Sequence, residues 1–106
     1  NNMSEEKEQI LETVNKIQEV VDLFYQQNDK EALEKFAVTI EDMIKAIDNL
    51  AAYKAENAQF EMDEVKIFNM LNEAMEAFQS DDKVLMADIL QYDFIECISE
   101  LAENME

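Results

Sequence analysis

The sequence predicts an all-α protein: an antiparallel four-helix bundle, built as two helical hairpins, in a single domain over residues 1–106. Three observations support this fold class. Glycine and proline are both absent from the 106 residues, and the dominant residues, such as Glu, Ala, Leu and Met, favour helices. Apolar residues recur at steps of three and four in successive stretches, as on one face of a helix. Polar breaks separate these stretches, and four amphipathic helices with short turns are typical of a bundle.

The first hairpin is predicted from two such stretches. The first helix covers about residues 4–27, with Ser4 as its N-cap and an apolar stripe of Ile10, Val14, Ile17, Val21 and Phe24. Asn28 and Glu31 then resemble a capping box. They open a second helix over about residues 29–53, with a stripe of Leu33, Phe36, Ile40, Met43, Ile47 and Leu50.

The second hairpin follows the least periodic stretch, residues 54–62, which we interpret as a long connection. Asp63 can cap a third helix over about residues 63–79, with a stripe of Ile67, Leu71, Ala74 (or Met75) and Phe78. The carboxylates of Asp81 and Asp82 favour the start of a fourth helix. This helix covers about residues 82–104, with a stripe of Ala87, Leu90, Phe94, Cys97 and Leu101.

The two predicted hairpins are of matched length. A shift of 54 positions places Phe24 on Phe78 in the first helix of each half, and Phe36 on Leu90 in the second. Two explanations are open: an ancestral duplication, or the register that any two hairpins of this size would show.

Composition excludes several classes of function. The chain has 8 lysines, no arginine and 26 carboxylates, which gives a net charge of −18, so nucleic acid would be repelled. Without glycine there is no phosphate-binding loop, and without histidine there is no imidazole base. We therefore expect no enzymatic activity, no catalytic residues and no cofactor.

An acidic helical bundle also suggests a carboxylate metal site. Such sites project Glu and His inward from facing helices, whereas the carboxylates here fall on the flanks of the apolar stripes, as at Glu12, Glu19, Glu34, Glu41, Glu73 and Glu76. We interpret them as solvated faces and expect no metal. On the fourth helix, Cys97 is expected to be a buried structural cysteine.

The expected location is the cytoplasm. A single cysteine cannot form an internal disulfide. The sequence has no apolar run of membrane-spanning length and no basic-then-apolar signal pattern, so no membrane association is expected.

The fourth helix is apolar over more than one face. With Leu90 and Phe94 pointing inward, Leu85, Ile89 and Tyr92 form a second stripe that one core cannot easily bury. We predict that these three residues bind a protein partner or mediate self-association, for example as a homodimer. The alternative is that the connection of residues 54–62 folds over them.

The same helix resembles a known family. The segment from Met86 to Phe94 is similar to one in small, all-helical, uncharacterised bacterial proteins of firmicute type, in which Ala-Asp followed by Leu-Leu-Glu-Tyr-Glu-Leu opens the last long helix. Ala87, Asp88, Leu90 and Tyr92 match that pattern. The proline that often follows is absent here. The resemblance covers about residues 82–104, and it implies an all-α bundle without a settled activity.

These observations lead to one functional hypothesis and two alternatives. The hypothesis is a non-enzymatic protein-interaction module, of an adaptor or chaperone-like kind. The alternatives are an acidic mimic that binds a basic protein, as some antitoxins do, and a carboxylate metal-binding bundle.

Overall fold

A computed structural model of the chain describes residues 2–105, with side chains from Glu5 onward. The described residues form helices and no strand. Three segments are regular α-helices: α1 (Asn2–Tyr25), α2 (Asp29–Glu56) and α3 (Glu64–Gln79). The fourth is one continuous helical segment made of α4 (Lys83–Asp88), the π-helical η1 (Ile89–Ile95) and α5 (Glu96–Glu103). The all-α prediction, with four helical segments, is confirmed.

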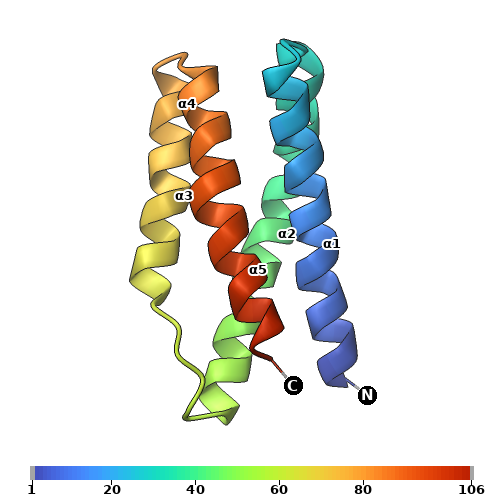
Figure 1. Cartoon of the computed structure of the whole chain (residues 1–106), viewed down its shortest axis with the longest axis vertical. Coiled ribbons are helices and arrows are strands. Elements are labelled where there is room, and N and C mark those ends of the chain that lie inside the picture. The colour runs from blue at the N-terminus through green and yellow to red at the C-terminus, as the bar shows by residue number, and fades with distance from the viewer. Residues whose placement is uncertain (1, 106) are drawn as a thin grey trace.

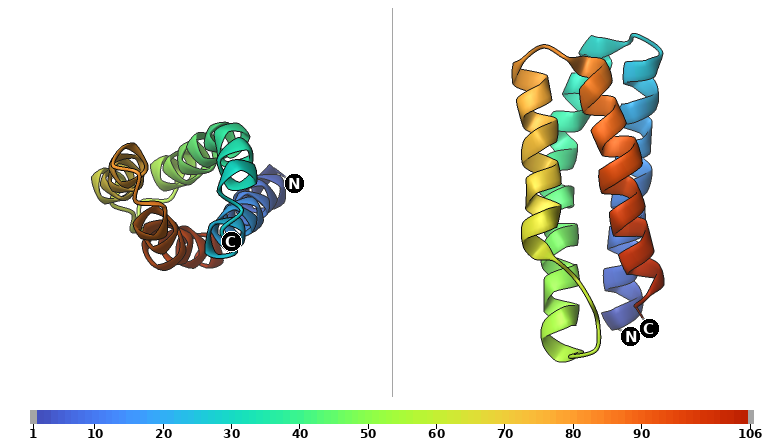
Figure 2. Two further views of the ribbon diagram at one scale, coloured as in Figure 1. Left: turned by 90° about the horizontal axis from the view of Figure 1, so that it is seen from above. Right: turned by 60° about the vertical axis from the view of Figure 1, so that its left-hand side comes forward.

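The four segments lie side by side along the long axis of the molecule (Figures 1 and 2). With 28 residues at a rise of about 1.5 Å per residue, α2 is about 40 Å long, so it extends over nearly the whole length of the molecule, whose longest dimension is 41 Å. Turns at one end join α1 to α2 and α3 to α4, while residues 57–63 cross the other end (Figure 1). The closest packing is between α1 and α2, between α3 and α4–η1, and between α1 and the fourth segment.

The helix boundaries lie within a few residues of the predicted ones. Asp63 caps α3 as predicted, accepting a hydrogen bond from the backbone N–H group of Lys66 (3.1 Å). Asp82, expected only to favour the start of the fourth helix by its charge, also caps α4 by accepting a hydrogen bond from the N–H group of Leu85 (3.0 Å). Ser4 lies inside α1 rather than before it, and its side chain is outside the described part of the structure. The second helix ends at Glu56, three residues beyond the predicted end, because Lys-Ala-Glu continues to favour helix.

The predicted capping box at Asn28 is wrong, because this residue completes a turn instead. Its N–H donates to the carbonyl of Leu23 (2.9 Å), and its side chain makes no cap hydrogen bond. Together with the bond from the Gln27 N–H to Phe24 (3.0 Å), this is a Schellman motif at the end of α1.

The same turn recurs 54 residues later. The N–H of Asp82 donates to Ala77 (2.9 Å), and that of Asp81 donates to Phe78 (3.0 Å). The residues in the left-handed conformation are Gln27 (φ 64°) and Asp81 (φ 59°), where most proteins place glycine. The 54-residue register seen in the sequence therefore extends to the backbone of both hairpin turns.

Gln27→Gly should stabilise the protein by about 1 kcal/mol, because glycine enters the left-handed region without the steric penalty of a Cβ atom. The measurement is the free energy of unfolding in urea. Gln26→Gly is the matched control: Gln26 does not have a positive φ, so glycine there should be neutral or destabilising. Equal effects of the two substitutions would contradict this account of the turn.

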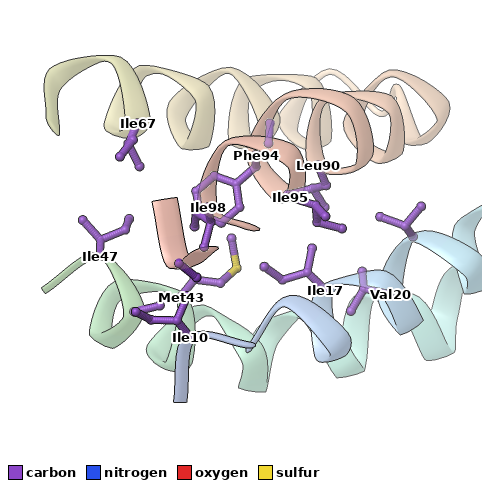
Figure 3. Packing of buried hydrophobic residues seen from close by; sticks show 14 of the residues in the cluster. Ile10, Ile17, Val20, Met43, Ile47, Ile67, Leu90, Phe94, Ile95 and Ile98 are labelled. Carbon is purple, nitrogen blue, oxygen red and sulfur yellow. The ribbon is translucent and has the colours of Figure 1, made fainter. Parts of the chain in front are cut away.

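The hydrophobic core lies between the two hairpins (Figure 3). In the figure, side chains of α1 and α2 face those of α3, η1 and α5. The largest fully buried side chains come from both hairpins: Ile10, Ile17, Val20, Val21, Met43, Ile47, Leu50, Ile67, Met86, Leu90, Phe94 and Ile98.

The third helix departs from its predicted stripe. Its buried residues are Ile67, Ala74 and Ala77, whereas Phe78, predicted to be in the core, is 37% exposed. This helix packs against α4 and η1. Its small buried residues, Ala74 and Ala77, suit a close helix contact, while Phe78 remains partly at the surface.

The π-helical segment changes which residues of the fourth helical segment are buried. Cys97 and Leu101 of the predicted stripe are only half-buried, and the fully buried row is Met86, Leu90, Phe94, Ile98 and Ala102. A step of four overshoots one α-helical turn by about 40°, so this row would drift around a regular helix by about 160°. A π-helix has more residues per turn, since its hydrogen bonds join residues i and i+5. The step from Leu90 to Phe94 within it therefore offsets part of this drift and keeps the row buried.

Ile98→Ala should therefore cost about 2–5 kcal/mol of the free energy of unfolding, and Leu101→Ala clearly less. Both substitutions remove a branched aliphatic side chain of the same size, and only Ile98 is fully buried. Urea unfolding of the two variants checks the register. A larger cost at Leu101 would show that the fourth segment follows the predicted α-helical stripe.

Candidate partner-binding surface

The predicted binding residues of the fourth segment lie on its outer side. Leu85 is 46% exposed and Tyr92 is 63% exposed, whereas Ile89 is half-buried and packs against the core. The connection of residues 57–63 does not cover them. The connection lies at the end of the molecule opposite to α4 (Figure 1). Its Phe60 and Met62 side chains are buried, and Phe60 packs edge-to-face on Tyr53 with ring centroids 4.8 Å apart.

Leu85 and Ile89 line a groove between α3 and the fourth segment. This groove has a volume of about 470 Å³, and we call its three apolar lining residues, Ala77, Leu85 and Ile89, its floor and its carboxylates its walls. We call it the acidic groove, because four carboxylates line it; its residues are Glu73, Glu76, Ala77, Ser80, Asp82, Leu85, Ile89 and Asp93. A second hollow continues along α3 past Glu73 and Asp93 to Met70 and Val65.

The carboxylates of the groove are not neutralised by lysines. Glu73, Glu76 and Asp93 form no ion pair with any lysine of the described part of the chain. The Asp82 carboxylate accepts the hydrogen bond that caps α4. An apolar floor beneath uncompensated negative charge favours a ligand that is apolar on one side and cationic on the other.

Tyr92 lies on a different flank, towards α1, and does not line the acidic groove. It is close enough to Tyr25 to influence the pKa of that residue. The Tyr25 hydroxyl donates a hydrogen bond of 2.5 Å to Asp88, and the Gln18 amide donates one of 2.7 Å to Gln91. The pKa of Tyr25 is raised, mainly by partial burial and to a smaller extent by this hydrogen bond to Asp88. The structure therefore brings Leu85 and Ile89 together and separates them from Tyr92.

Cys97 is half-buried, not fully buried as predicted, because the π-helical segment turns Ile98 into the core instead. It lines a hollow of about 530 Å³ together with Lys54, Lys66 and Leu101. Burial raises the pKa of the Cys97 thiol; the positive charge of Lys66 acts in the opposite direction, and Glu100 adds to the rise.

Alkylation of Cys97 by iodoacetamide at pH ~8 should be slower in the folded protein than in urea, because burial restricts access and the raised pKa lowers the thiolate fraction. The rate should increase as the pH rises toward the pKa of the folded thiol. Equal rates for folded and unfolded chains would contradict the placement of this side chain.

The carboxylates singled out in the sequence are exposed, as predicted: Glu12, Glu19, Glu34, Glu41, Glu73 and Glu76. Among the side chains described, no three His, Cys, Asp or Glu residues are grouped in a way that could hold a metal ion. None of the described helices combines the length and the hydropathy that crossing a bilayer requires.

Sequence reasoning identified Leu85 and Ile89 but missed the opposite wall of the groove. Glu73, Glu76 and Ala77 follow one another at steps of three and one on α3. Their spacing shows only that they share one side of a helix. The side of α3 that contacts another helix could have been predicted from Ala74 and Ala77, because small residues indicate a close helix contact.

Comparison with known proteins identifies a family. No curated protein and no solved structure matches the chain. The sequence model of one family, described as a domain of unknown function (DUF8042), matches residues 2–104. This match extends far beyond residues 82–104, where the sequence resembles a family of uncharacterised helical proteins. The chain belongs to the DUF8042 family.

Proposed function

We propose that the four helical segments form an antiparallel bundle and that the chain acts as a non-enzymatic protein-interaction module, of an adaptor or chaperone-like kind. The observation that supports this function is the acidic groove. Leu85, 46% exposed, lies beside Ile89 on its floor, and no other described segment of the chain covers them. Apolar side chains in a hollow with a charged rim are typical of interaction sites.

The helices provide a rigid support for this surface. Leu85 and Ile89 are one helical turn apart, and Ile89 is held by its packing against the core. A partner would therefore meet a groove that is already formed, which reduces the entropy cost of binding.

The charge favours a different protein over a second copy of this chain. Each copy carries a net charge of −18, and two acidic grooves facing each other would repel.

We also propose a cytoplasmic location, because a free cysteine is suited to a reducing compartment.

The acidic mimic of a nucleic acid is the second candidate, and the net charge of −18 favours it. Such a protein would bind a basic partner through many exposed carboxylates, with no contribution from an apolar floor. Its binding would be lost steeply as the salt concentration rises. No observation favours the carboxylate metal-binding bundle.

Leu85→Ser should abolish capture of the partner from lysate of the source organism, because it removes an apolar contact from the groove floor. The measurement is a pull-down with tagged protein at ~0.1 M and ~0.5 M salt, where the screening lengths are about 10 Å and below 5 Å. We prefer Leu85 to Ile89 because Ile89→Glu would also place a charge against the core.

Val38→Ser is the matched control, since Val38 is 72% exposed on α2 and lies outside the groove. It should leave capture unchanged. Circular dichroism shows that each variant is folded. A partner that is retained by Leu85→Ser and lost at ~0.5 M salt would favour the acidic mimic and contradict the interaction module.

A further inference from the structure

We infer that the acidic groove is the docking site for a basic amphipathic helix of a partner protein. This inference rests on the proposed function and names the chemistry of the partner. Three observations support it: the shape of the groove, its charge, and the distribution of lysines along the chain.

The groove lies between two helices and follows α3. The hollow lined by Leu85 and Ile89 shares Glu73 and Asp93 with the hollow that reaches Val65. The two hollows are therefore neighbours along α3, which has 16 residues and is about 24 Å long. A partner helix of about 16 residues would match this length.

The apolar residues of the floor would contact an apolar stripe on the partner helix. Ala77, Leu85 and Ile89 provide it in the first hollow, and Met70 and Val65 provide apolar surface in the second. Contacts spread along a helical path are made by side chains at positions i, i+3 or i+4, and i+7 of a docked helix. A compact ligand would fill only one of the two hollows.

The carboxylates of the walls favour positive charge on the partner helix. The first hollow is lined by Glu73, Glu76, Asp82 and Asp93 and by no lysine. Residues 57–106 hold 13 of the 26 carboxylates and two of the eight lysines, Lys66 and Lys83. Lys83 pairs with Asp29 and Asp81 outside the groove, and Lys66 lines the second hollow. Lysine or arginine side chains beside an apolar stripe would complement these walls.

The probe for the test is a synthetic helix of about 16 residues, with leucines along one face and lysines elsewhere. A second peptide has the same composition with its leucines distributed around the helix. We expect the amphipathic peptide to bind the purified protein about tenfold more tightly, because only it places leucines on the floor while its lysines reach the walls. Titration calorimetry at ~0.1 M salt measures both dissociation constants.

Two double variants separate the groove from the overall charge. Glu73→Lys with Asp93→Lys changes the groove walls, while Glu34→Lys with Glu41→Lys changes exposed residues of α2. Both raise the net charge equally. The first should weaken binding of the amphipathic peptide about tenfold or more, and the second about threefold or less. If the change at Asp93 disturbs the π-helical segment in thermal unfolding, Glu73→Lys with Glu76→Lys replaces the first pair.

A pair of single variants tests the floor. Leu85→Ser should weaken binding of the peptide, whereas Phe68→Ser, at a side chain that is 41% exposed on α3 and outside the groove, should leave it unchanged. The inference is overturned by equal weakening from both double variants, by equal affinity for both peptides, by dependence on Phe68 in place of Leu85, or by no binding of either peptide. The proposed function is tested separately, since it fails only if capture from lysate does not depend on Leu85.

Discussion

The structure depends on one row of apolar side chains in its last helical segment. Met86, Leu90, Phe94, Ile98 and Ala102 are fully buried and four residues apart. In Figure 3, Leu90, Phe94 and Ile98 face side chains of α1 and α2 across the core. An α-helix alone could not hold such a row in line. The π-helical segment Ile89–Ile95 supplies the extra residue per turn, so that both hairpins can bury their apolar faces against each other.

The same geometry shapes the outer surface. Leu85, Ile89 and Asp93 are also four residues apart, and all three line the acidic groove. A π-helical turn that aligns the core row therefore aligns this outer row as well, beside α3. The close approach of α3 through Ala74 and Ala77 then makes a groove instead of a filled contact. Core packing and the proposed binding surface thus both depend on the π-helical segment.

The sequence predicted the helices well and the side-chain register less well. Periodicity and composition are local properties, so they identified four helices, the cap at Asp63, the start of the fourth helix near Asp82, and a 54-residue register that the two turns share. The positions of Cys97, Leu101 and Phe78 were wrong, because a π-helical segment and a close alanine contact arise from tertiary packing. The candidate site was predicted in part for the same reason: Leu85 and Ile89 share a helix face, whereas the carboxylates of Glu73 and Glu76 reach the groove only through the packing of α3.

Docking in the acidic groove should leave the other faces of this charged protein free. Amide chemical shifts of the ¹⁵N-labelled protein, recorded while the leucine–lysine peptide is added, locate the peptide on the surface. We expect the largest changes in residues 73–80 and 85–93, with little change along the solvent face of α2. Changes spread evenly over the carboxylates of all four helical segments, or concentrated on α1 and α2, would contradict docking in the groove.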